Sequence, residues 1–201
     1  MSWQLFGSAF VTLFVIMDPP GVVPVFLALT GNLRPSERKR AAWQAVAVAF
    51  GVITVFAVFG RTILEYLHIS LPALQGAGGL LLLLVALELL TGKADDPETA
   101  KGSNVAMVPL GTPLLAGPGA IVATMVYVQS SDGALDYLTL ALAIVAVHLC
   151  LWASMRYSVV LLRVLKESGI LLVTRIAGLL LSAIAVQLVA DSVRAFIEGS
   201  G

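Results

Sequence analysis

Hydrophobic residues fill this chain in long runs, and short polar segments separate the runs. Six runs approach or exceed the roughly 20 apolar residues that a helix needs to cross the hydrocarbon core of a bilayer. We therefore predict six membrane-spanning helices: Trp3–Thr30, Trp43–Tyr66, Leu71–Leu90, Val105–Val128, Tyr137–Met155 and Gly169–Phe196.

Prolines and glycines interrupt two of these runs. The first run contains DPPGVVP, with Pro19, Pro20 and Pro24, and the fourth contains VPLGTPLLAGPGAIV. Proline removes a backbone donor and clashes with the carbonyl four residues earlier, so neither run can form one regular helix. Irregular backbone at membrane depth is tolerated where it is buried in protein or lines a wet cavity. The alternative is a proline kink that neighbouring side chains repair.

The two halves of the chain resemble each other. A shift of 98 residues places Pro20-Gly21 on Pro118-Gly119, and a shift of 99 places the GLLL at 79–82 on the GLLL at 178–181. A unit with three spans must insert upside down when it is repeated. We predict an all-α membrane protein with six transmembrane helices, built as two inverted three-helix repeats (1–92 and 104–198) with helices 1 and 4 broken. Residues 1–201 form a single domain.

Composition and charge agree with this class. Hydrophobic residues make up 59% of the chain and charged residues 12%, against about 25% charged in soluble domains. The scattered basic residues form no face for nucleic acid. Nine of them lie in the first, third and fifth connections, which the positive-inside rule places in the cytoplasm. We expect a multi-pass protein of a prokaryotic inner membrane with both termini outside, and no removable signal peptide.

The two interruptions are the candidate substrate site. Discontinuous helices commonly meet near the bilayer midplane, where free N–H groups attract anionic substrate groups. We expect a substrate carboxylate at the amides after Pro20 and Pro118, and an ammonium near Asp18, because a carboxyl group inside a membrane suggests function. Helix capping is sufficient to explain Asp18, and helix packing to explain the glycines. The candidate residues are Asp18, Pro19, Pro20, Gly21, Thr112, Pro113, Ala116, Gly117, Pro118 and Gly119.

Three further residues are candidates for gating or proton transfer. Glu88 and Arg175 fall at similar depth in the inverted topology and could pair as an inner gate, or each could reach the interface separately. His148 lies within the fifth run and, like Asp18, could carry protons, or it could bond to a backbone carbonyl. No catalytic motif and no cluster of metal-ligating residues is present, so we expect no enzyme, no metal and no cofactor.

The motifs DPPGVVPVFLAL, AGGLLLLLVALELL, VPLGTPLLAGPGAI and TRIAGLLLSAIAVQLV, in this order, resemble the MarC family of inner-membrane proteins, also called the UPF0056 or small neutral amino acid transporter family. The resemblance implies two inverted three-span halves, and some relatives take up glycine, alanine and similar amino acids with protons. The family's aspartate or asparagine before proline falls on Asp18, its PLLAGPG segment on Pro113 to Gly119, and an arginine on Arg175.

The sequence therefore favours a secondary transporter of small neutral amino acids (glycine, alanine, serine) that is coupled to protons and works by alternating access. Its partners would be the amino acid, the proton and the lipid bilayer. Whether the protein forms a homo-oligomer is left open by the sequence. Two alternatives remain: a membrane scaffold that transports nothing, and an exporter of small metabolites that uses the same site.

Overall fold

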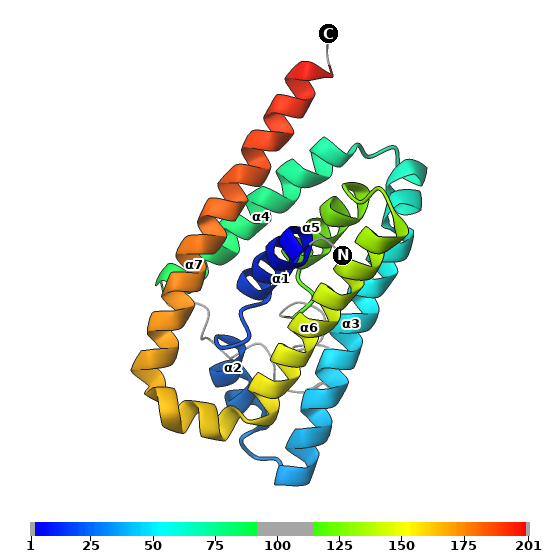
Figure 1. Ribbon diagram of the computed structural model, residues 1–201. Helices are drawn as coiled ribbons and strands as arrows, with labels where there is room; N and C mark the ends of the chain where they lie inside the picture. The colour runs from blue at the N-terminus through cyan, green and yellow to red at the C-terminus, as the bar shows by residue number, and fades with distance from the viewer. Residues whose placement is uncertain (1–2, 92–114, 200–201) are drawn as a thin grey trace.

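The computed structural model describes residues 3–91 and 115–199, and all regular elements in these residues are α-helices (Figure 1). The prediction of an all-helical protein is confirmed for this part of the chain. The seven helices in the described residues are α1 (Trp3–Met17), α2 (Val22–Thr30), α3 (Pro35–Tyr66), α4 (Leu71–Thr91), α5 (Pro118–Gln129), α6 (Ala134–Arg156) and α7 (Ser158–Glu198).

Four of the described helices, α3, α4, α6 and α7, are long and apolar enough to cross a membrane. Together α1 and α2 qualify as a fifth span, bent by 45° at the predicted break. The fourth predicted span, Val105–Val128, lies partly outside the described residues, and its described part, α5, has 12 residues. The protein is thus a multi-pass membrane protein, and the sixth crossing stays a prediction.

Individual residues determine where α3 begins and where α7 bends. At the start of α3, Arg34 has an extended backbone and Pro35 takes the first helical position. The carboxylate of Glu37 accepts a bond from the Arg34 N–H (3.0 Å) and pairs with the Arg34 guanidinium (2.7 Å), which satisfies a free donor at the helix end. Within α7, Lys166 has φ 57° and interrupts the helix.

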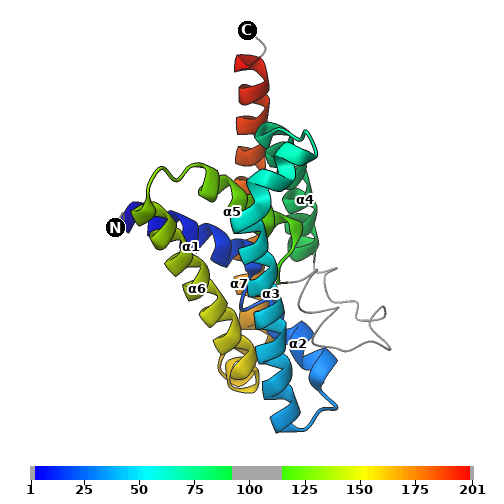
Figure 2. The same cartoon turned by 90° about the vertical axis from the view of Figure 1, so that its right-hand side faces the viewer.

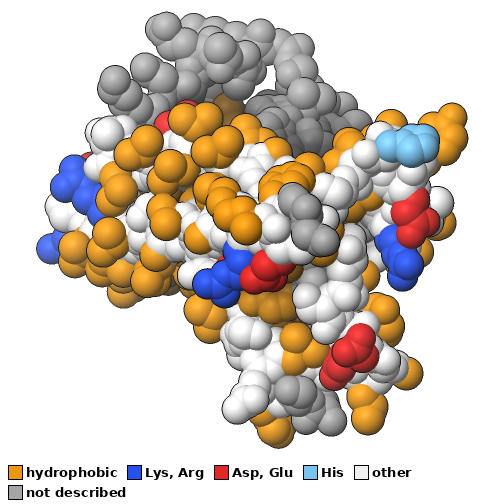
Figure 3. Space-filling model, turned by 90° about the horizontal axis from the view of Figure 1, so that it is seen from above, with side chains coloured by type: hydrophobic (Ala, Val, Ile, Leu, Met, Phe, Trp, Pro, Cys, Tyr) orange, Lys and Arg blue, Asp and Glu red, His pale blue; other side chains and the backbone are white. Residues whose placement is uncertain are grey.

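The chain reverses between two ends of the molecule (Figures 1 and 2). The α2–α3 and α6–α7 connections lie at one end, whereas the α3–α4 and α5–α6 connections and the C-terminus lie towards the other. Basic residues lie at the first of these ends: Arg34 is in the α2–α3 connection, Arg38, Lys39 and Arg40 are in the first turns of α3, and Arg156 ends α6. Seen from the C-terminal end, hydrophobic side chains cover much of the visible outline, and charged side chains form a few small groups (Figure 3). The orientation in the inner membrane stays a prediction.

Two buried clusters hold the helices together. The larger cluster joins α1, α2, α3, α5 and α6, and the smaller joins α4 to α7 through Leu82, Ala86, Leu181 and Ala185. In the smaller cluster the helices approach closely because glycines face backbone: Gly79 lies against the Ala185 carbonyl, and Gly178 against the Ala86 carbonyl. Gly178 follows Gly79 by 99 positions, and Ala185 follows Ala86 by 99 positions. This is the same shift that aligns the two halves of the sequence.

Candidate functional site: the first helix break and its cavity

The break between α1 and α2 is a tight turn centred on two prolines. The Asp18 N–H still donates to the Phe14 carbonyl (3.0 Å), and the Asp18 backbone then adopts φ 37°, a region that aspartate tolerates better than most residues. Pro19, Pro20 and Gly21 follow, and the Val22 N–H returns to the Asp18 carbonyl (3.1 Å). The turn changes the direction of the chain without leaving the protein interior.

The Asp18 side chain is 7% exposed and closes this turn. Its Oδ1 accepts a hydrogen bond from the Gly21 N–H (3.2 Å), as a helix cap does, whereas Oδ2 is buried and has no hydrogen-bond partner among the described residues. A Cβ on Gly21 would overlap Oδ2, and the Thr174 hydroxyl lies beside the same point. Gly21 has an ordinary helical φ of −69°. Close approach, rather than backbone conformation, therefore requires glycine here.

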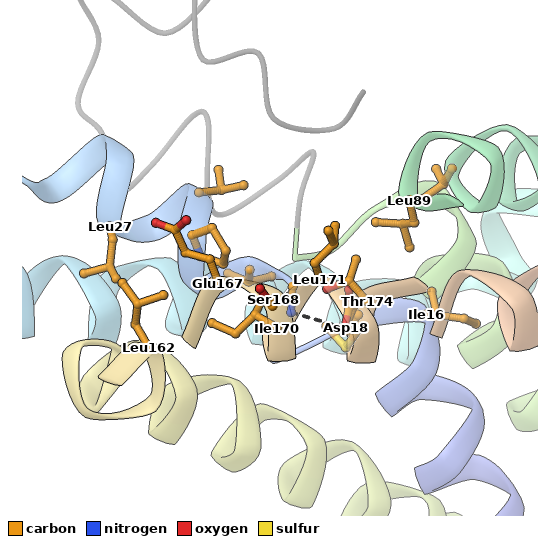
Figure 4. Close-up of a pocket in the computed structure, with 16 residues that line it drawn as sticks. Ile16, Asp18, Leu27, Leu89, Leu162, Glu167, Ser168, Ile170, Leu171 and Thr174 are labelled. Carbon is orange, nitrogen blue, oxygen red and sulfur yellow. Dashed lines mark hydrogen bonds between the residues drawn. The ribbon is translucent and has the colours of Figure 1, made fainter. Parts of the chain in front are cut away.

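A cavity of about 660 Å³ lies beside the break, between α1, α2, α4 and α7 (Figure 4). Asp18 and Gly21 line it at the break, and Val85 and Leu89 line it from α4. One face of α7 supplies much of the remaining wall, with Glu167, Ser168, Ile170, Leu171 and Thr174. Asp18, whose Oδ2 is buried without a partner among the described residues, thus lines a space that can hold a small solute.

The expectation of bare amides after Pro20 is wrong. The N–H groups of Gly21, Val22 and Val23 all donate to acceptors within the turn. Acceptors are what the break leaves free: Pro19 and Pro20 have no N–H and the Gly21 N–H bonds to Asp18, so the carbonyls of Val15, Ile16 and Met17 have no donor among the described residues. The C-terminal end of α1 also carries the negative end of the helix dipole. The break therefore suits a cationic group better than a carboxylate.

The described part of the second interruption, from Leu115 onward, does not line this cavity. Leu115 and Ala116 are buried in the larger cluster, Gly117 is extended, and α5 starts at Pro118. The amides of Ala120 and Ile121 donate to the Gly117 carbonyl, and Gly119 packs closely against Leu82. Ala116, Gly117, Pro118 and Gly119 are absent from the cavity lining, as are Pro19 and Pro20 at the first break, and Thr112 and Pro113 lie outside the described residues. The described residues of the second break therefore do not share this cavity.

The other candidates lie apart from the cavity. Glu88 and Arg175 are both exposed, and ion pairs in the described residues join Arg34 to Glu37 and Arg61 to Glu65 instead. Their gate stays a prediction. His148 is 4% exposed on α6, with Nδ1 2.8 Å from the Ile144 carbonyl and its ring edge against Phe50 of α3. Its role in proton transfer also stays a prediction.

Comparison with known proteins identifies the family. The family model described as "MarC family integral membrane protein" matches residues 3–197. The chain belongs to the MarC family. Among curated proteins, a UPF0056 membrane protein of Methanocaldococcus jannaschii is 36% identical over 96% of this chain and 98% of its own length.

Two bacterial proteins are similar to this chain to a comparable degree. The UPF0056 membrane protein YhcE of Escherichia coli is 31% identical over 98% of this chain and 95% of its own length. The UPF0056 membrane protein YvbG of Bacillus subtilis is 29% identical over 94% of both chains. No solved structure matches this chain.

Sequence reasoning placed Asp18 and Gly21 at the candidate site but missed the contribution of α7. Glu167, Ile170, Leu171 and Thr174 recur at the spacing that places residues on one face of a helix, and the two polar residues stand at its ends. That pattern was visible in the sequence of this MarC-family chain. What it faces was not visible, because the partner of a helix face depends on tertiary packing.

Proposed function

We propose that this MarC-family protein is a secondary transporter of small neutral amino acids, among them glycine, alanine and serine, in a prokaryotic inner membrane. The observation that carries the proposal is the buried Asp18 carboxyl, whose Oδ2 has no partner among the described residues and which lines a cavity at a broken helix. A carboxyl group within a membrane segment is costly and marks a functional site by default. Broken helices are where many transporters bind their substrates.

The substrate would bind with its ammonium group at Asp18. Oδ2 and the Thr174 hydroxyl lie together beside Gly21, and the break offers backbone acceptors rather than donors. The substrate carboxylate would point away from Asp18 into the remaining cavity volume. Asp18 would also carry the coupled proton, since a carboxyl group can alternate between a proton and an ammonium partner.

Alternating access would use the two halves of the chain. The paired contacts of Gly79 with Ala185 and of Gly178 with Ala86 support an inverted repeat, because they exchange when the halves are interchanged. The cavity extends to Leu162 and Glu167 in the first turns of α7, near the end that holds the α2–α3 and α6–α7 connections (Figure 1). With those connections in the cytoplasm, this conformation would open inward.

Counterflow of labelled alanine into proteoliposomes tests the proposal, with and without a proton gradient. We expect uptake by the wild type, stimulation by the gradient, and at least a tenfold loss in Asp18→Asn. Glu198→Gln, an exposed carboxylate at the far end of α7, is the matched control. Folded protein that moves none of glycine, alanine or serine would reject the proposal.

A second experiment separates transport from the scaffold alternative. If the protein is a transporter, Asp18→Ala should abolish alanine counterflow, and the purified variant should keep its helical content and its oligomeric state. If the protein is a scaffold, Asp18→Ala should instead disturb its assembly with other membrane proteins. An exporter would show the same Asp18 dependence as an importer, and the imposed gradients would set the direction of net flux.

A further inference from the structure

The described lining of the cavity beside the first break is acidic. Of its described lining residues, Asp18 and Glu167 are the charged ones, and neither lysine nor arginine is among them. Asp18 is buried at the break, whereas Glu167 is exposed on α7 directly after the interruption at Lys166. A ligand that carries a carboxylate would meet two like charges there, and a ligand that carries only ammonium groups would meet two opposite charges.

One strip of α7 lines the cavity between the two carboxyl groups (Figure 4). Glu167 belongs to one end of the strip, and Asp18, from the break between α1 and α2, lies beside the other end. Thr174 lies beside Asp18, and Glu167 lies seven residues earlier on the same helix face. At 1.5 Å per residue, the axial separation between them is about 10 Å. Ile170 and Leu171 line the cavity between these ends. The strip is polar, then apolar, then polar again.

The hydrogen-bonding groups at the Asp18 end are suited to N–H donors. Oδ2 has no partner among the described residues, and the amides that follow the break are already bonded. A primary ammonium has three donors and no acceptor. It would satisfy Oδ2 and the Thr174 hydroxyl oxygen together, and a charge-assisted hydrogen bond of this type is stronger than a neutral one.

We infer that this cavity binds linear primary amines, and that an α,ω-diamine fits it best, with one ammonium at Asp18 and the other at Glu167. The methylene chain would lie along Ile170 and Leu171. The inference deepens the proposed function, on whose site it rests, by assigning recognition to the ammonium group and not to the carboxylate. We take 1,3-diaminopropane as the probe, because its two ammonium groups are joined by a short methylene chain and the strip from Thr174 to Glu167 is about 10 Å long.

Isothermal titration of the purified full-length protein tests the inference with matched ligands. Ethylamine is alanine without its carboxylate, and propionate is alanine without its ammonium. We expect ethylamine to bind at least as tightly as alanine, propionate not to bind, and 1,3-diaminopropane to bind at least tenfold more tightly than propylamine.

Two variants assign the ends of the ligand. Asp18→Asn should weaken every amine at least tenfold. Glu167→Gln should remove the advantage of the diamine and leave propylamine within twofold, and Glu198→Gln should change nothing. Because Glu167 is exposed, its variant should fold normally, so the test stands even if Asp18→Asn is unstable.

Three results would overturn the inference: propionate binding, alanine binding more than tenfold tighter than ethylamine, or a diamine advantage that survives in Glu167→Gln. The inference and the proposed function fail separately. Amines that bind through Asp18 without any amino acid transport would reject the proposed function alone. Alanine transport that depends on Asp18, with no amine binding, would reject the inference alone.

Discussion

The N–H of Gly21 bonds to Oδ1 of Asp18 while the missing side chain of Gly21 leaves room for Oδ2 of the same carboxyl group. The two residues therefore support each other: the carboxyl satisfies a free donor at the start of α2, and the glycine lets the carboxyl lie flat against the turn. One oxygen stabilises the fold, and the other is buried without a hydrogen-bond partner among the described residues. Structure and function at this break can thus be separated by substitution.

Asp18→Asn should preserve the stability of the protein, and Asp18→Ala should keep the fold but lower its stability. Asparagine keeps an oxygen for the Gly21 N–H and tolerates a positive φ, whereas alanine loses the cap, at a cost of about 0.5–2 kcal/mol. Thermal unfolding in detergent measures the difference, with Asn close to the wild type and Ala clearly lower. Equal melting temperatures for the Ala variant and the wild type would show that this hydrogen bond contributes nothing.

Gly21→Ala should displace the Asp18 carboxyl and abolish ligand binding. The Cβ would overlap Oδ2, and the Thr174 hydroxyl blocks the adjacent space, so we expect a stability loss of about 1–3 kcal/mol from overpacking. Gly7→Ala in α1 is the matched control, because nothing lies within 4 Å of its Cβ position. Ligand titration and unfolding measure both effects. A Gly21→Ala variant that binds normally would remove Asp18 from the site.

Gly79→Ala should weaken the contact between α4 and α7 more than Gly178→Ala does. The Cβ on Gly79 would lie 2.8 Å from the Ala185 carbonyl oxygen, whereas that on Gly178 would lie 3.1 Å from the nearest side-chain atom and 3.3 Å from the Ala86 oxygen. Backbone cannot yield as a flexible side chain can, so we expect a loss of about 1–3 kcal/mol for Gly79→Ala.

Unfolding in denaturant, with detergent present, measures this order. Gly51→Ala in α3 is the control, since its Cβ position is empty, and it should cost nothing. The reverse order of Gly79 and Gly178 would contradict the α4–α7 packing described above.

The fold was largely predictable because its signals are local. Long apolar runs give spans, and Pro19 and Pro20 break a helix through their own covalent structure, wherever the helix packs. The site was only partly predictable. The amides of Gly21 and Val22 bond to Asp18, whose backbone has a positive φ. The sequence alone does not predict this backbone conformation. Thr174 reaches the break because α7 packs there, and that contact spans more than 150 residues of sequence.

Thr12 and Tyr127 should couple α1 to α5 through a single hydrogen bond. Their hydroxyl oxygens lie 3.0 Å apart and are partly buried. Hydrogen bonds between membrane helices average about 0.6 kcal/mol in double-mutant cycles. We expect a coupling energy of about this size from unfolding measurements on Thr12→Val, Tyr127→Phe and the double variant. These substitutions remove the hydroxyl groups and keep the shapes of the side chains. Additive effects of the two substitutions would show that the hydroxyls do not interact.

Single cysteines should label from opposite sides of the membrane. In a Cys150→Ala background, we expect a membrane-impermeant maleimide to reach Asp132→Cys and Glu198→Cys from outside intact cells. Arg40→Cys and Arg163→Cys should react only after permeabilisation, because basic connections stay in the cytoplasm. All four side chains are exposed in the described structure. If Arg40→Cys and Arg163→Cys react from outside and the other two variants do not, the orientation is the reverse of the predicted one, and the Asp18 cavity opens to the other side. If the two members of one pair react from different sides, the arrangement of the helices is contradicted.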